Sequence, residues 1–115
     1  MGVWDWTDLG NELAEEEELP VWYKRFAPVP ESELATVLSP STYVDRIKMP
    51  IFIVYSGKDE VVYPSQNIRA ILELSANGNT PESLYLTEEG HFPENISSRK
   101  MIISHLSEFL NKNIN

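Results

Sequence analysis

The sequence feature that most constrains the fold is the stretch at residues 50–59, PIFIVYSGKD. After Pro50, β-branched and aromatic residues follow one another with no polar residue between them. Such a run predicts a strand covered on both faces, as in a parallel sheet between helices, and proline suits the start of a strand. The Ser56-Gly57 pair signals a turn, so Asp59 is expected on a loop beyond the carboxyl end of this strand. Ligands and catalytic groups collect at that edge of open α/β sheets.

A regular alternation of elements is expected after this strand. Apolar residues recur at helical spacing from a predicted N-cap at Ser65 to the Asn77-Gly78 pair, which signals the end of a helix. Residues 83–87 are short and apolar enough for a second strand. A loop that carries His91 comes next. A closing helix is expected from residue 97 or 98 to 111, with one apolar face formed by Ile102, Leu106, Phe109 and Leu110.

This order places Asp59 and His91 on loops that follow successive strands. If the strands are parallel and joined by a right-handed crossover, both loops leave the same edge of the sheet and the two side chains can meet. A carboxylate that accepts the Nδ1 proton of an imidazole leaves Nε2 to take the proton of a serine hydroxyl, and Asp before His is the chain order of α/β-hydrolases. Taken alone, Asp59 is better explained as a turn-forming or capping residue. Gly90 is expected to allow a tight backbone turn beside His91.

Residues 1–49 are expected to form an irregular helical segment, lid-like or connecting, and residues 50–115 the C-terminal α/β segment. Short helices are expected near residues 9–14 and 31–38, while the glutamate run at 15–18 is interpreted as a solvated face or a loop. One helical face is predicted to carry the aromatic residues Trp22, Tyr23 and Phe26. Packing in the core is favoured over a role in a pocket wall for these three residues, since aromatic side chains more often pack in the core than contact a ligand.

Composition excludes several functional classes. The formal net charge of −9 repels phosphates and anionic lipid surfaces, so neither nucleic acid nor a membrane is expected as a partner. No cysteine is present, which excludes a disulfide scaffold and a cysteine nucleophile. His91 and His105 lie on different elements without ligand spacing, so no metal site and no cofactor are expected, and His105 is expected to be a surface or partly buried residue of a helix. Without a signal peptide or an apolar run near the roughly 18 residues of a membrane span, a cytoplasmic location is the default expectation.

Two segments of the chain resemble the C-terminal part of an α/β-hydrolase: SPSTYVDRIKMPIFIVYSGKDEVVYP and LYLTEEGHF. The similarity is greatest to prolyl oligopeptidase-like serine peptidases and esterases. It is carried by the Ser39-Pro40 pair, the lead-in at 45–50, the strand, GKDEVV at 57–62, and Glu89-Gly90-His91. The opening GVWDW is similar to the segment that follows the strand after the nucleophile helix in that family. The resemblance implies the α/β fold class, as a partial α/β-hydrolase fold with two parallel C-terminal strands and flanking helices.

By position, the resemblance implies that Asp59 is the acid and His91 the base of a catalytic triad acting on a peptide or ester substrate. The nucleophile motif G-x-S-x-G is missing, because no two of the five glycines lie four positions apart around a serine. Ser56 is flanked at those positions by Val54 and Lys58. In the enzymes that the chain resembles, the nucleophile and the oxyanion hole lie upstream. The chain is therefore expected to be the C-terminal portion of a serine hydrolase, inactive by itself.

One alternative is a non-catalytic, hydrolase-derived module that folds by forming a homo-oligomer or by pairing with another chain, such as the upstream half of the hydrolase. The physical reason for this alternative is that a sheet of only two strands has little stability of its own and that edge strands expose unpaired backbone groups. A truncated product whose parent does the chemistry is a third hypothesis, and the sequence does not distinguish it from the second.

Overall fold

The computed structural model describes residues 2–16 and 18–114. Helical elements fill the first part of the chain: α1 (Trp6–Glu16), α2 (Val21–Phe26), α3 (Glu33–Leu38) and the 3-10 helix η1 (Pro40–Arg46). Strands and helices alternate after them: β1 (Phe52–Ser56), α4 (Pro64–Ala76), β2 (Glu82–Leu86) and α5 (Ile96–Asn113). Both predicted strands are present, shifted by one residue from their expected bounds.

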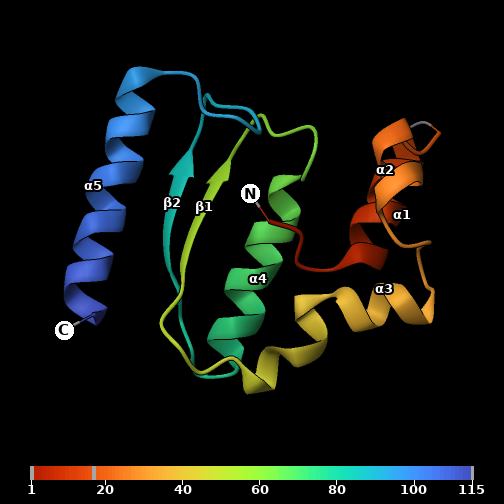
Figure 1. Ribbon diagram of the computed structural model, residues 1–115, viewed down its shortest axis with the longest axis horizontal. Coiled ribbons are helices and arrows are strands. Elements are labelled where there is room, and N and C mark those ends of the chain that lie inside the picture. Colours follow the sequence, from red (N-terminus) through yellow and green to blue (C-terminus); the bar gives the residue numbers. More distant parts are fainter. Residues whose placement is uncertain (1, 17, 115) are drawn as a thin grey trace.

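Strands β1 and β2 pair in parallel, in a register that runs from Phe52 opposite Glu82 to Ser56 opposite Leu86. In the part of the chain that the structure describes, these two strands make up the sheet. Figure 1 shows α4 on one side of the sheet and α5 on the other. The structure therefore confirms the prediction of an α/β fold with two parallel strands and flanking helices.

Successive residues of β1 contact helices on opposite sides of the sheet. Ile53 packs with the buried cluster that α4 forms with the N-terminal segment, whose members are Trp4, Ala70 and Leu74. Its neighbour Phe52 stacks on Phe109 of α5, with ring centroids 5.6 Å apart. An uninterrupted apolar run fits a strand with helices on both sides. The cover is partial, however, because most residues of β1 are only half-buried.

Helix α4 begins one residue before the predicted N-cap. Pro64 occupies its first turn, where a fixed φ and a missing N–H are no disadvantage. The predicted N-cap at Ser65 is therefore wrong, and its hydroxyl instead donates a hydrogen bond of 2.6 Å to Glu12. At the other end Gly78 has a φ of 79°, and the Asn79 N–H bonds to the carbonyl of Leu74, so the predicted glycine stop is confirmed.

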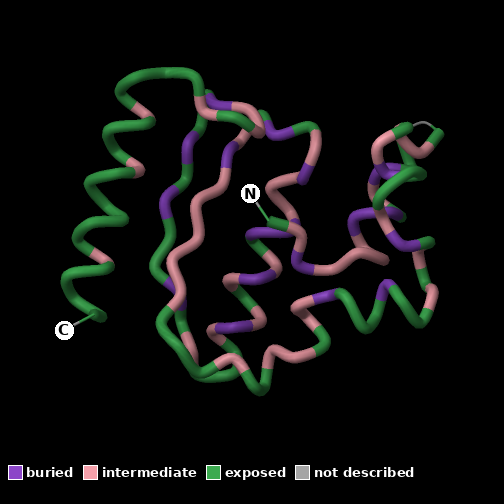
Figure 2. The backbone as a smooth tube through the Cα atoms, viewed as in Figure 1, coloured by how far each residue is buried: buried purple, intermediate pink, exposed green. Residues whose placement is uncertain are grey.

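Helix α5 lies along the sheet, and little of its surface is covered by other elements. It begins at Ile96, earlier than expected, because Asn95 acts as the N-cap and accepts a hydrogen bond from the Ser97 N–H. None of its described residues is buried, and Figure 2 shows the helix as mostly exposed. On the predicted apolar face, Leu106 and Leu110 are each 40% exposed. Among the described residues, no helix is long and apolar enough to cross a membrane.

The N-terminal helices have a buried cluster of their own, formed by Leu9, Leu13 and Tyr23. Tyr23 is 1% exposed, and its hydroxyl donates a hydrogen bond of 2.7 Å to the carbonyl of Trp6. Core packing is thus confirmed for Tyr23, whereas Phe26, the last residue of α2, is 79% exposed. In the glutamate run, Glu17 lies outside the described residues. The division of the chain at residues 49 and 50 stays a prediction.

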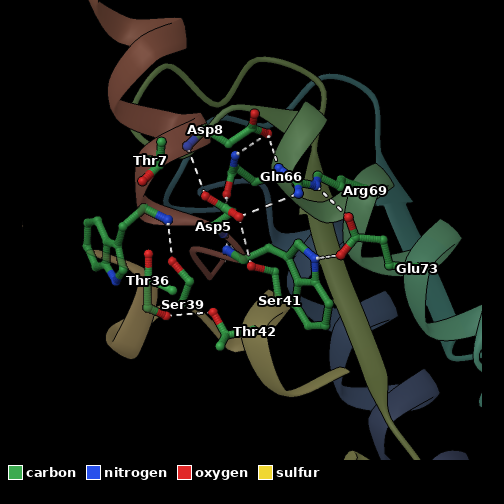
Figure 3. A network of polar contacts seen from close by, with 12 residues as sticks. Asp5, Thr7, Asp8, Thr36, Ser39, Ser41, Thr42, Gln66, Arg69 and Glu73 are labelled. Atoms are coloured by element: carbon green, nitrogen blue, oxygen red, sulfur yellow. Dashed lines mark hydrogen bonds and ion pairs between the residues drawn. The ribbon is translucent and has the colours of Figure 1, made fainter. Parts of the chain in front are cut away.

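A network of polar side chains fastens residues 4–8 to α4 (Figure 3). Fully buried Gln66 accepts hydrogen bonds from the backbone N–H groups of Trp4 and Asp5, at 3.1 and 2.9 Å. One turn later, Arg69 forms ion pairs with the carboxylates of Asp5, Asp8 and Glu73. The hydrogen bond with Glu73 is the main cause that raises the pKa of Arg69. Because both side chains belong to α4, the N-terminal segment is held against the helix that follows the Asp59 loop.

Replacing Leu74 tests whether α4 packs as described. Its side chain is 1% exposed, whereas that of Leu72 on the same helix is 65% exposed. We expect Leu74→Ala to lower the free energy of unfolding by about 2–5 kcal/mol, through lost burial and a residual cavity. Leu72→Ala, the matched control, should change it by less than about 0.5 kcal/mol. Denaturant unfolding of both variants measures this, and similar losses at the two positions would contradict the packing.

Candidate active site

Asp59 lies in the turn that follows β1 and is almost fully buried, at 4% exposure. Its Oδ1 accepts hydrogen bonds from the N–H groups of Val61 and Val62, each at 2.9 Å. This is the local turn-forming role that an aspartate alone suggests. These hydrogen bonds use Oδ1 only, so Oδ2 remains available for another partner.

The second oxygen meets His91. Asp59 Oδ2 lies 2.9 Å from His91 Nδ1, although the residues are 32 positions apart in the chain. Because an ionised carboxylate can only accept hydrogen bonds, this contact needs the proton on Nδ1 and leaves the lone pair of the neutral ring on Nε2. The imidazole is 22% exposed, whereas the carboxylate is 1% exposed. The structure thus brings the two predicted residues together in the orientation that proton transfer at Nε2 requires.

Backbone hydrogen bonds join the two loops directly above the sheet. The N–H of Gly57 bonds to the carbonyl of Leu86 at 2.9 Å, and the N–H of Lys58 bonds to the carbonyl of Glu89 at 3.0 Å. A side chain at Gly57 would place its Cβ 2.7 Å from the carbonyl oxygen of Thr87, so this close approach requires glycine. The parallel pairing of the strands therefore continues into the loops that carry Asp59 and His91.

Gly90 directly precedes a bend of the backbone at His91 and Phe92. Its backbone lies outside the left-handed region, which among the described glycines only Gly78 adopts. A Cβ at Gly90 would lie 3.6 Å from the carbonyl oxygen of Lys58, an ordinary van der Waals contact. The structure therefore does not require glycine at this position.

Glu89 is a residue of the site to which the sequence analysis assigned no function of its own. It is 8% exposed, and its carboxylate accepts hydrogen bonds from the backbone N–H groups of Glu94 and Asn95, at 3.0 and 3.2 Å. A hydrogen bond with Ser98, followed by the one from the Glu94 N–H, lowers the pKa of the Glu89 carboxyl. The sequence offers no signal that singles out Glu89, because the adjacent residue Glu88 is of the same type.

No serine among the described residues forms a hydrogen bond with His91. Ser56, next to the turn that carries Asp59, is fully buried, and its hydroxyl makes no hydrogen bond within the described residues. The second histidine, His105, is exposed on α5 and bonds to the carbonyl of Met101, as expected for a surface residue.

A parallel sheet between helices, with a carboxylate–imidazole pair at its carboxyl edge, is compatible with part of an α/β-hydrolase fold. The comparison with protein families is more specific: the prolyl oligopeptidase family matches residues 1–115. The chain belongs to that family, which confirms the resemblance seen in the sequence and relates the chain to serine hydrolases. A search of curated proteins found no match. The catalytic roles of Asp59 and His91 stay predictions.

Replacing Asp59 by asparagine tests the orientation of the pair. Two backbone N–H groups hold the Oδ1 position, so the amide oxygen of Asp59→Asn should stay there and its NH₂ group should face His91. His91 must then accept at Nδ1, and we expect its proton to move to Nε2. Two-bond ¹H–¹⁵N correlation spectra distinguish the tautomers. Glu60→Gln, at the exposed neighbouring position, is the control, and an Nδ1 proton retained in the asparagine variant would contradict this geometry.

Proposed function

We propose that this chain supplies the acid and the base of a serine hydrolase that acts on peptide or ester bonds. The observation that carries the proposal is the 2.9 Å contact between Asp59 and His91 Nδ1 at the carboxyl edge of the two parallel strands. The nucleophile is a serine of a G-x-S-x-G segment outside residues 1–115, because these residues contain no such motif. Membership of the prolyl oligopeptidase family favours a peptide substrate.

In this reaction the Nε2 atom of His91 takes the proton of the serine hydroxyl as the serine attacks the carbonyl carbon. The same atom then donates that proton to the leaving amine or alcohol. Asp59 keeps the ring in the tautomer with a proton on Nδ1 and stabilises the imidazolium formed during the attack. Its burial strengthens this electrostatic effect, because little water screens the carboxylate.

A fluorophosphonate probe, which reacts with activated serines, tests the proposal. We expect no labelling of the 115-residue chain alone and labelling of the G-x-S-x-G serine when this chain is joined to, or mixed with, the upstream part of the hydrolase. His91→Gln should lower the labelling rate by roughly 1,000-fold or more, since no base then activates the serine.

The matched control is His105→Gln, which alters an exposed histidine of α5 and should leave labelling unchanged. Labelling of a serine in the isolated chain would show that the nucleophile lies within residues 1–115. Equal labelling of the His91 and His105 variants would overturn the role of His91 as base.

A second candidate function is a non-catalytic module that associates with a second copy of itself. The observation that favours it is an open hollow of about 420 Å³ beside β1, lined by Phe52, Val54, Pro93, Ile102 and Leu106. Leu106 is 40% exposed although it lines this hollow, and α5 has no buried residue among those described. Apolar surface of this kind marks association sites in folded proteins.

Sedimentation of the isolated chain tests this second candidate. Self-association through the hollow should depend on protein concentration and be abolished by Leu106→Glu, which places a charge in the contact. Ile103→Glu is the control, because Ile103 is 65% exposed on the same helix and does not line the hollow. A strictly monomeric chain that unfolds cooperatively would exclude the module, and equal effects of the two variants would exclude the hollow as its interface.

A further inference from the structure

We propose that Glu89 is a positioning residue, which fixes His91 at hydrogen-bonding distance from Asp59. The catalytic meaning of this role rests on the function proposed above, but the role itself is a structural statement. It follows from three sets of contacts that Glu89 makes with the segments around His91.

The first contacts close the loop that contains His91. Glu89 lies at its beginning, and the two carboxylate oxygens reach across Gly90–Pro93 to its end. Oε2 accepts the N–H of Glu94 at 3.0 Å, and Oε1 accepts the N–H of Asn95 at 3.2 Å. One side chain therefore spans the loop, and His91 lies within the span.

The second contact joins this closed loop to the Asp59 loop. The backbone carbonyl of Glu89 accepts the N–H of Lys58, the residue directly before Asp59. The main chain of Glu89 is thereby tied to one partner of the pair while its side chain holds the loop of the other. A change in the loop closed by Glu89 would alter the separation of the Asp59 and His91 side chains.

The third set of contacts joins the loop to α5. Asn95, one of the two residues that Glu89 holds, is the N-cap of this helix. A hydrogen bond with Ser98 and the positive charge of Arg99 also favour the ionised Glu89 carboxyl. A negative charge at the start of a helix is further favoured by the helix dipole. Glu89 is therefore a stable anion at neutral pH and a strong acceptor for both N–H groups.

Glu88 offers a matched comparison on the same loop. It is the adjacent carboxylate, but its side chain is 76% exposed and is paired with Lys58 at the surface. It accepts no hydrogen bond from the far end of the loop. Removing either charge changes the net charge equally, so Glu88→Gln controls for the loss of one negative charge from this loop.

The experiment compares Glu89→Gln and Glu88→Gln in the 115-residue chain by NMR. We expect the His91 Nδ1 proton, shielded by its bond to Asp59, to exchange with water at least about 10-fold faster in Glu89→Gln, because the loop opens more often. Glu88→Gln should change this rate by less than about 2-fold. Glu89→Asp, which keeps the charge but is one methylene shorter, should give an intermediate exchange rate. This variant replaces Glu89→Gln in the measurement if Glu89→Gln does not fold.

The reconstituted hydrolase provides a second measurement. Glu89→Gln should lower kcat by about 10- to 100-fold with little change in KM, because misplacement of the base affects the chemical step. An unchanged exchange rate of the His91 proton in a folded Glu89 variant would overturn the positioning role, whatever the activity. Faster exchange together with no labelling of the unaltered reconstituted protein would support the positioning role and contradict the proposed function.

Discussion

The parallel pairing of β1 with β2 is the constraint on which the site depends. Its register ends with Ser56 opposite Leu86, so both strands stop at the same level and their loops leave the sheet side by side. One more hydrogen bond of the same kind, from Gly57 to Leu86, extends the pairing into the first loop. In an antiparallel pair the carboxyl ends would lie at opposite edges. Strand direction and loop length thus bring Asp59 and His91 close together. Their side chains only complete the contact.

The features that the sequence predicts well are those encoded locally. An apolar run between a proline and a glycine pair is enough to predict β1, and the Asn77-Gly78 pair predicts the end of α4. The errors occur where a distant residue competes with a local preference. Ser65 is a good N-cap residue by type, but its hydroxyl bonds to Glu12, which lies 53 positions away. Such partners are chosen by tertiary packing, and no periodicity within one segment reveals them.

The same distinction applies to the candidate site. Asp59 and His91 can be predicted because each follows a strand and because their order matches a known chain order. Glu89 has a different kind of role. Its side chain accepts hydrogen bonds from backbone N–H groups of its own loop, those of Glu94 and Asn95. Glutamate is common in exposed loops, and the neighbouring Glu88 is an instance of it. Only the three-dimensional structure distinguishes Glu89, whose carboxylate closes the loop, from Glu88, whose carboxylate faces solvent.

The division of the Asp59 carboxylate between two tasks explains how the pair can be ordered within this chain. Oδ1 is held by Val61 and Val62, which are near neighbours in sequence, so the plane of the carboxylate is set by its own turn. That plane directs Oδ2 at His91. A nucleophilic serine is not needed for any of these contacts, because the donors and acceptors that orient the pair lie within residues 57–99 of this chain. Asp59 and His91 are therefore ordered by local hydrogen bonds, which is the preorganisation that the proposed catalytic role requires.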